Sequence, residues 1–349
     1  MSGEVISLPE VIESEAQLDD VLALPTPALV QTMAGLKGDL VILGVAGKMG
    51  PTLARLARRA LDEAGSRRQV IGVARFSEPG VRERLEEWGV RTLTADLLDR
   101  KALAALPDAK DVVFMAGRKF GSSGQEELTW AMNTYLPAMV AERYRDARIV
   151  ALSTGNVYPF TTVESGGPTE DSPVGPVGEY AQSCLGRERM FQYAGVRYGT
   201  PAALIRLNYA IDLRYGVLVD VARKVFDGEP VDLTMGYANV IWQGDANAAI
   251  LRALDHAASP AFVLNLTGPD IVSIRKAAME FGEVFGKEPI LRGAEAETAL
   301  LSNASRYVRL MGGPTVTTER LKRWSAQWVR GGGRLLNKPT HYEARDGQF

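Results

Sequence analysis

The chain has 349 residues, of which 46% are hydrophobic and 23% charged, a composition typical of a globular protein with one or two packed domains. Lysines and arginines number 40 against 42 aspartates and glutamates, so the net charge of -2 favours neither nucleic acid nor an anionic membrane surface as a partner. The single cysteine, Cys184, excludes an internal disulfide and leaves a cysteine-built zinc site without ligands.

No signal for export or membrane insertion is found along the chain. The first residues, MSGEVISLPEVIESEAQLDD, are acidic and lack both a basic start and an apolar run. No stretch elsewhere reaches the ~18 consecutive apolar residues that a membrane-spanning helix needs. We therefore expect a soluble protein of the reducing cytoplasm, with no membrane partner.

Residues 1–37 carry two short helix-like patterns, near 15–23 and 26–35. The sequence Pro25-Thr26-Pro27 separates them, and proline breaks helical periodicity. We expect this segment to form a helical appendage to the main fold.

From residue 38 to about 210 the pattern changes to short apolar runs that alternate with amphipathic stretches. The runs are rich in Val, Ile and Leu at successive positions, as in parallel strands buried on both faces. They read DLVILGV, QVIGVA, VRTLTA, DVVFMAG, ARIVALS and AALIRLN. This alternation predicts an α/β fold, a doubly wound parallel sheet with helices on both faces.

The first run leads directly into GVAGKMG, in which Gly44, Gly47 and Gly50 are spaced as GxxGxxG. Glycines at this spacing permit a tight turn and let backbone N–H groups approach a pyrophosphate at a helix N-terminus. Because the turn follows a strand and opens a helix, we expect it to bind a dinucleotide, with Lys48 and Met49 of the same turn at the cofactor.

The end of the second run indicates which dinucleotide is bound. An NAD site usually carries an acidic residue there, whereas an arginine accommodates the 2′-phosphate of NADP. This chain has Arg75 after Ala74, so we expect NADP to be preferred over NAD, with Lys48 either adding charge near that phosphate or lying solvated at the surface. Asp96 and Leu97 after the third run, and Ala116 at the end of the fourth, are further predicted cofactor contacts.

After residue 210 the alternation of strand and helix patterns becomes less regular. Short strands and helices between 211 and 330 predict a smaller substrate-binding domain, although some of these later segments are expected to return to the dinucleotide-binding domain of residues 38–210. Three glycines, at 331–333, precede a polar tail that ends at residue 349. This tail either folds back over the site, reaches a neighbouring subunit, or is disordered, as chain ends commonly are.

The order of these motifs resembles the extended short-chain dehydrogenase/reductases, the NAD(P)-dependent sugar epimerase/dehydratase group. The resemblance runs over about residues 39–330 and rests on GxxGxxG, Asp96-Leu97, STGNVY at 153–158 and a helical tyrosine, Tyr180. It implies a Rossmann-like sheet of about seven strands and a C-terminal substrate domain.

The same resemblance implies the catalytic residues. Thr154 takes the position of the family's Ser/Thr, and Tyr180 that of its tyrosine, which also borders the cofactor. Tyr180 would exchange a proton with the substrate oxygen while Thr154 holds that oxygen by a hydrogen bond and hydride passes to or from the nicotinamide.

Cys184 departs from the family, which has a lysine four residues after the tyrosine. That lysine binds the nicotinamide ribose and lowers the pKa of the tyrosine; a cation about 5 Å away shifts such a pKa by roughly two units. Oxidised nicotinamide, Lys119 or Arg187 can substitute for it. Alternatively Tyr180 acts only as an acid, or the site binds without reacting. A small thiol on a helix is more typical of packing than of a nucleophile.

The substrate end departs as well. In RLNYAID, Asn208 stands one place before the family's asparagine, and YANVIWQGD lacks the family's arginine. These changes weaken the case for a nucleotide diphosphate handle, so a free sugar, sugar acid, lactone or other small hydroxy or keto compound becomes a competing substrate. The resemblance also implies a homodimer formed through helices near 125–144 and 177–195.

Two functional hypotheses follow. The first is an NAD(P)-dependent oxidoreductase or epimerase/dehydratase acting on a sugar-like compound. The second is a dinucleotide-binding sensor or interaction protein that kept the fold and lost the reaction, which Cys184 favours. Retention of both Thr154 and Tyr180 favours the enzyme, because a site without chemistry has no need of two hydroxyls at one oxygen.

Overall fold

A seven-stranded parallel sheet forms the centre of the computed structural model, which describes residues 7–119, 124–338 and 340–347. Its strands are β1 (Leu40–Leu43), β2 (Val70–Ala74), β3 (Arg91–Thr94), β4 (Asp111–Phe114), β5 (Arg148–Thr154), β7 (Ala202–Leu207) and β12 (Phe262–Leu266). They lie in the order β12-β7-β5-β4-β1-β2-β3, and every neighbouring pair is parallel. The prediction of a doubly wound parallel sheet of about seven strands is confirmed.

Alternate residues of each strand supply two separate cores. Leu40 and Ile42 of β1 belong to the core on one face of the sheet, while Val41 and Leu43 belong to the core on the other. All four side chains are fully buried. Continuous apolar runs are what such strands require, because neither face meets water.

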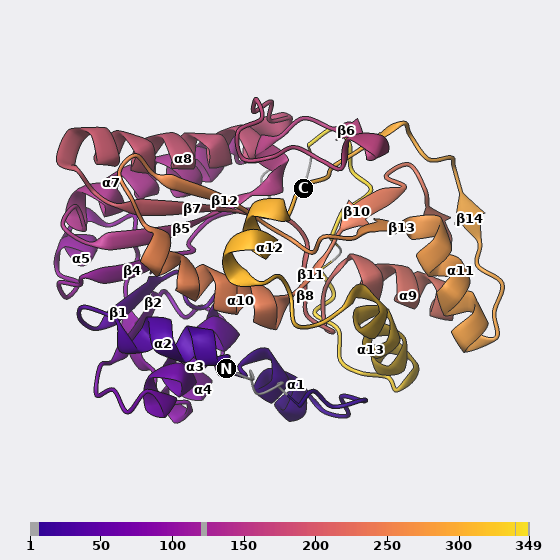
Figure 1. The fold of residues 1–349 in the computed structure, drawn as a ribbon, viewed down its shortest axis with the longest axis horizontal. Helices are drawn as coiled ribbons and strands as arrows, with labels where there is room; N and C mark the ends of the chain where they lie inside the picture. The colour runs from indigo at the N-terminus through magenta and orange to yellow at the C-terminus, as the bar shows by residue number, and fades with distance from the viewer. Residues whose placement is uncertain (1–6, 120–123, 339, 348–349) are drawn as a thin grey trace.

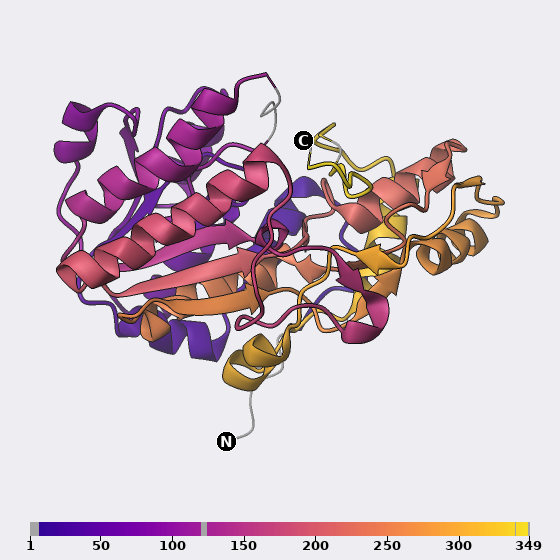
Figure 2. The ribbon, with the colours of Figure 1, turned by 90° about the horizontal axis from the view of Figure 1, so that it is seen from above.

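Helices cover both faces of the sheet (Figures 1 and 2). One face is covered by α2 (Pro27–Ala34), α3 (Gly50–Glu63), α4 (Val81–Glu87) and α10 (Gln243–Arg252). The other is covered by α5 (Arg100–Ala104), α7 (Leu136–Arg143) and α8 (Gly178–Tyr198), with α6 (Glu126–Trp130) and a π-helix (Ala131–Tyr135) leading into α7.

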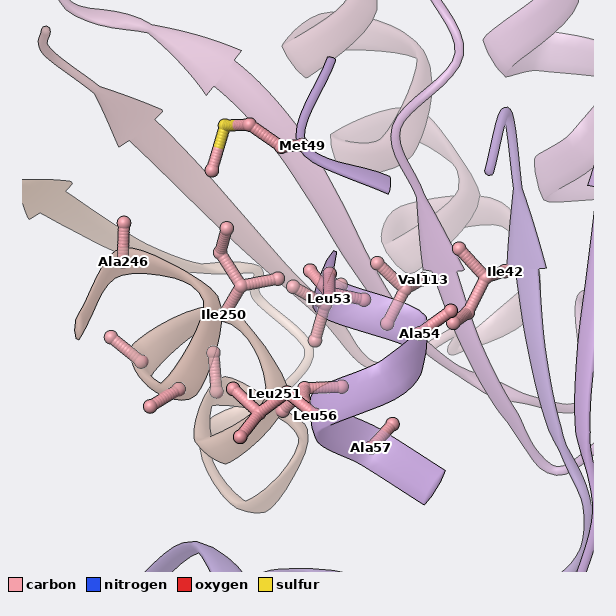
Figure 3. Packing of buried hydrophobic residues seen from close by; sticks show 14 of the residues in the cluster. Ile42, Met49, Leu53, Ala54, Leu56, Ala57, Val113, Ala246, Ile250 and Leu251 are labelled. Carbon is pink, nitrogen blue, oxygen red and sulfur yellow. The ribbon is translucent and has the colours of Figure 1, made fainter. Parts of the chain in front are cut away.

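The packing of α3 against α10 anchors the glycine turn (Figure 3). Leu53 and Leu56 of α3 lie between the sheet residue Val113 and the α10 residues Ile250 and Leu251. Each of these side chains is fully buried. Burial of one such side chain contributes about 1.5–3 kcal/mol, so the helix that begins at the turn is firmly held.

A second lobe lies beyond the carboxyl ends of the strands and has its own core (Figure 1). Its helices are α9 (Val217–Asp227), α11 (Ile274–Phe285), α12 (Ser305–Met311), which packs back on β12, and α13 (Thr318–Arg330). Its paired short strands are β6 (Thr161–Thr162) with β15 (Thr298–Ala299), β8 (Ala210–Ile211) with β11 (Ile241–Trp242), β9 (Val231–Asp232) with β14 (Leu291–Arg292), and β10 (Tyr237–Asn239) with β13 (Ile271–Ser273).

The N-terminal segment forms α1 (Glu15–Leu22) and α2, close to the two helix ranges predicted. Ser14 and Thr26 cap them by accepting hydrogen bonds from backbone N–H groups of the first turn. Leu18 of α1 is buried in the core of the second lobe, and Met33 of α2 in the core beneath the sheet. The segment expected as an appendage is thus packed into both parts of the molecule.

Candidate active site

The glycine turn after β1 fits tightly against its neighbours. Gly44 has φ +89°, and a Cβ placed on it would lie 2.5 Å from the backbone nitrogen of Ala116. A Cβ at Gly50 would lie 2.0 Å from the carbonyl oxygen of Val45. The turn therefore brings the backbone of β1, the end of β4 and the start of α3 closer together than any side chain permits.

A cavity of about 310 Å³, here called the turn cavity, opens beside this turn. Predicted cofactor residues from four strand ends line it together: Gly44, Gly47, Arg75, Asp96, Leu97 and Ala116. The Asp96 carboxylate accepts a hydrogen bond from the backbone N–H of Leu98 at 3.0 Å, which orders the loop after β3. The structure thus assembles most of the predicted dinucleotide contacts at the carboxyl edge of the sheet.

A second cavity, of about 430 Å³, contains the two predicted catalytic hydroxyls and is here called the tyrosine cavity. Thr154 at the end of β5 and Tyr180 in the first turn of α8 both line it. Gly47, Met115 and Gly117 line both cavities, so the two adjoin each other. A ligand that lies in the turn cavity can extend directly to Tyr180.

Lys48 and Met49 line the tyrosine cavity, whereas Arg75 lines the turn cavity. The Lys48 ammonium donates a hydrogen bond to the carbonyl oxygen of Ala210 at 3.1 Å and lies 4.7 Å from the ring centroid of Tyr215. Lys48 and Arg75 are therefore not brought together. Burial lowers the pKa of Lys48 to about 8.

The hydroxyls of Thr154 and Tyr180 lie near each other on the wall of this cavity. The Thr154 hydroxyl donates to Oδ1 of Asn156 at 2.9 Å and accepts from the Asn156 N–H at 3.2 Å, so its position is set by the turn that follows β5. Burial strongly raises the pKa of Tyr180. The phenol is therefore protonated at neutral pH and suited to donate a proton.

Arg187 lies behind the cavity and provides a cation near Tyr180. Its guanidinium donates hydrogen bonds to the carbonyl oxygen of Leu152 at 2.6 Å and to Oδ1 of Asn133 at 2.7 Å. A Cβ on Gly117 would lie 2.5 Å from Nη2 of Arg187, so glycine leaves space for the guanidinium. The positive charge lowers the pKa of Tyr180, although burial has the larger effect.

Asn133 is a functional candidate that the sequence pattern did not reveal. It lies in the π-helix and is fully buried. Its amide nitrogen donates to the carbonyl oxygen of Arg118 and to the Ser183 hydroxyl, while its oxygen accepts from Arg187. One-turn π-helices are frequent at functional sites, and the sole local signal was a polar residue within the helical pattern WAMNTY.

Cys184 stands where the family has a lysine, and its side chain packs rather than projects. It is 1% exposed and lies in a small apolar cluster with Val157 and Tyr158. Burial raises the pKa of its thiol, which disfavours the nucleophilic thiolate. This environment agrees with the interpretation of Cys184 as a packing residue.

Lys119, the other candidate for the missing cation, follows β4 and lines the tyrosine cavity. Its ammonium donates a hydrogen bond to the carbonyl oxygen of Thr340 at 3.3 Å. Burial lowers the pKa of Lys119 to about 8, opposed by the nearby Cys184 and Asp220. Lys119 thus lies within the cavity, whereas Arg187 acts on Tyr180 from behind it.

Asn208 follows β7 and also lines the tyrosine cavity. It is 2% exposed, and its side-chain nitrogen has no hydrogen-bond partner within the described part of the chain. A buried amide donor without a partner costs about 1–3 kcal/mol. A ligand oxygen in the cavity would offset this cost.

The C-terminal tail folds back over the tyrosine cavity, which was one of the three alternatives that the sequence left open for the tail. The backbone N–H of Leu336 donates to the carbonyl oxygen of Arg214 at 3.0 Å, and the N–H and hydroxyl of Thr340 donate to Oδ2 of Asp220 at 2.9 and 2.7 Å. Figure 2 shows the yellow tail between the two lobes. Leu336, Lys338 and Thr340 line the cavity.

Within the described residues, no cluster of three or more His, Cys, Asp or Glu side chains could hold a metal ion. Likewise, no helix in residues 7–119, 124–338 or 340–347 is long and apolar enough to span a membrane.

Comparison with known proteins gives a family match and a set of structural neighbours. The model of the NAD-dependent epimerase/dehydratase family matches residues 40–263. A sequence comparison with curated proteins finds no match.

The structural neighbours share the fold at low sequence identity. A dTDP-glucose 4,6-dehydratase from Streptomyces venezuelae, solved with NAD, has a TM-score of 0.69 at 20% identity, over 84% of this chain and 97% of that one. A UDP-glucuronic acid 4-epimerase from Bacillus cereus, in complex with NAD, has a TM-score of 0.68 at 16% identity, over 84% and 98%. A UDP-glucose 4-epimerase from Thermotoga maritima, with UDP-glucose, has a TM-score of 0.67 at 17% identity, over 84% and 99%.

Proposed function

We propose that this chain, which belongs to the NAD-dependent epimerase/dehydratase family, transfers hydride between a nicotinamide dinucleotide and a hydroxyl-bearing carbon of a sugar or sugar-like compound. One observation carries the proposal: the hydroxyls of Thr154 and Tyr180 line one cavity together with residues of the glycine turn. This arrangement places a proton donor where a ligand extending from the turn would end.

The residues around the turn cavity fit a dinucleotide. The close approach at Gly44 and Gly50 leaves backbone N–H groups and the start of α3 accessible to a pyrophosphate. Asp96 and Leu97 of the turn cavity would border the adenine half, and Met49 and Tyr180 of the tyrosine cavity would border the nicotinamide half. When bound, the nicotinamide supplies the hydride donor or acceptor.

Tyr180 acts mainly as an acid. Because burial raises the pKa of Tyr180, its hydroxyl donates a proton to a substrate carbonyl oxygen, and Thr154 hydrogen-bonds the same oxygen. Arg187 lowers the cost of the phenolate that remains. In the direction of alcohol oxidation the phenolate must form first, so this rate rises with pH over the range below the raised pKa.

A direct test uses the dinucleotide-loaded protein. Incubation with the reduced cofactor and a panel of keto sugars and keto acids is expected to consume the absorbance of reduced nicotinamide and to yield the corresponding alcohol. Tight dinucleotide binding without hydride transfer to any compound in the panel would contradict the enzyme and favour the sensor, the alternative that the replacement of the family lysine by Cys184 suggests.

The finer choice of cofactor rests on Arg75, which is exposed at the end of β2 and lines the turn cavity. We expect NADP to bind more tightly than NAD. Arg75→Ala is expected to weaken NADP binding about tenfold or more, because a hydrogen bond to a charged group contributes about 1.5–3 kcal/mol, and to leave NAD binding unchanged. Calorimetric titration measures both.

Arg91→Ala is the matched control for this substitution, since Arg91 is an exposed arginine on the neighbouring strand β3. Retention of NAD by the purified protein, with equal effects of Arg75→Ala on both dinucleotides, would overturn the preference for NADP.

Homodimerisation through α7 and α8 is the quaternary arrangement that we propose. Exposed apolar side chains gather on α8 and on the helix that leads into α7: Tyr135 is 46% exposed, Tyr193 57% and Val196 89%. Light scattering is expected to give twice the mass of the 37.8 kDa chain, and Val196→Glu is expected to shift the mass toward one chain. A monomeric wild-type protein would contradict the proposal.

A further inference from the structure

We propose that the substrate is a small anion without a nucleotide handle, and that Lys119, with Lys338, binds its charged group in the tyrosine cavity. The charged group is a carboxylate or a phosphate monoester. This inference rests on the proposed function, because it names the class of compound on which the same site acts.

The charges around the tyrosine cavity have one sign. Three lysines line it, from separate parts of the chain: Lys48 from the glycine turn, Lys119 from the segment after β4, and Lys338 from the tail. Among the described residues that line the cavity, none is an aspartate or a glutamate. A neutral sugar has no need of such a lining, whereas an anion is attracted by it.

Burial at this site disfavours the charged form of the lysines. It lowers the pKa of both Lys48 and Lys119 to about 8. The Asp220 carboxylate opposes this effect at Lys119, yet one of its oxygens already accepts two hydrogen bonds from Thr340. An anion in the cavity would stabilise the ammonium groups more directly than a carboxylate held by the tail.

Lys119 is the lysine best placed for the substrate. Lys48 donates to the carbonyl oxygen of Ala210, and its charge lies beside the Asp212–Arg214 pair. Lys119 donates to the carbonyl oxygen of Thr340 in the tail and lines the same cavity as Tyr180. A group bound to Lys119 would therefore lie close to the hydroxyl that donates the proton.

The tail limits the size of the substrate. It is fastened to the second lobe by Arg345, which donates to the carbonyl oxygen of Thr298 at 2.8 Å, and by the buried Tyr342. At its far end Gly347 contacts the start of α8, since a Cβ on Gly178 would lie 2.6 Å from the carbonyl oxygen of Gly347. The cavity of about 430 Å³ must hold the nicotinamide and its ribose as well as the substrate, so a small compound fits and a nucleotide-linked sugar would have to displace the tail.

The test compares three keto compounds that share one polyhydroxy skeleton and end in a hydroxymethyl, a carboxylate or a phosphate group. With wild-type holoenzyme, kcat/KM for at least one anionic compound is expected to exceed that for the neutral compound about tenfold or more, as expected for a hydrogen bond between charged groups. The rank of the two anions distinguishes carboxylate from phosphate. Equal values for all three compounds would overturn the proposal.

Variants assign the effect to the lysine. Lys119→Met is expected to reduce the ratio of kcat/KM for the anionic to the neutral compound about tenfold, mainly through KM, and Lys119→Arg to preserve it. Lys338→Met is expected to reduce the same ratio less, because Lys338 is exposed. Lys101→Met, in the exposed part of α5, is the control that leaves the ratio unchanged.

A failure of the proposed reaction can be separated from a failure of this inference. If no compound reacts, calorimetry on the dinucleotide-loaded protein measures binding of the same three compounds. Anion binding that Lys119→Met weakens would uphold the anion site even without turnover. Binding that is equal for neutral and anionic compounds, or unaffected by Lys119→Met, would overturn it.

Discussion

Tyr180→Phe is expected to lower kcat by about 10²–10⁴-fold, the usual contribution of a positioned acid or base, with little change in dinucleotide affinity. The substitution removes the phenolic hydroxyl near Thr154 and keeps the ring that lines the cavity. Hydride transfer measured in a single turnover reports the chemical step, and titration with the dinucleotide reports binding.

The matched control is Tyr193→Phe, on the same helix but 57% exposed. It is expected to react like the wild type. A Tyr180→Phe protein with unchanged turnover would remove Tyr180 from the reaction, and with it the assignment of Thr154 as its partner.

Arg206→Ala is expected to lower the free energy of unfolding by roughly 3–5 kcal/mol, the cost of removing one partner of a buried ion pair. Arg206 and Glu188 are 4% and 0% exposed and form two hydrogen bonds of 3.0 and 2.8 Å. The Ser153 hydroxyl also donates to Glu188, at 2.6 Å. Without the guanidinium, a buried carboxylate loses its compensating charge.

Denaturant unfolding measures this loss, and Arg189→Ala, at an exposed position of α8, is the control. A paired replacement, Arg206→Met with Glu188→Leu, is expected to recover much of the stability, because it leaves no charge behind. If Arg206→Ala lowers the free energy of unfolding by less than about 1 kcal/mol, the prediction is wrong, because so small a loss is typical of surface ion pairs. Because Ser153 adjoins Thr154 and Glu188 shares a helix with Tyr180, the pair also connects β5 and α8, the two elements that carry the Thr154 and Tyr180 hydroxyls.

The sheet and the glycine turn could be predicted because their signals are local. Strands such as β1 are apolar at every position, and the spacing of Gly44, Gly47 and Gly50 directly reflects the backbone contacts that the structure has. The positions of Thr154 and Tyr180 came from the family resemblance, and the structure places them on one cavity wall.

Features that depend on distant partners could not be predicted. The direction of Lys48 is set by Ala210 and Tyr215, which belong to a different part of the chain. The role of Asn133 depends on Arg187, on another helix. Met33 has the apolar character of a core residue, yet the neighbouring residues in the sequence do not indicate which of the cores it belongs to. In each case the residue type indicates its chemical character, but the sequence does not indicate which distant residue it contacts.

The two ends of the chain have a consequence for the order in which the protein matures during synthesis. Asp20 of α1 binds Arg55 of α3 at 2.6 Å, whereas Asp19 binds Arg214 at 2.9 Å and Glu15 binds Arg334 at 3.2 Å, so this helix meets its later partners only after much more of the chain has been made. At about 5–20 residues per second, it waits many seconds for them. Lys338 and Thr340 reach the cavity later still. A nascent chain can therefore form its sheet and its glycine turn well before the tail segment around Lys338 and Thr340 completes the wall of the tyrosine cavity.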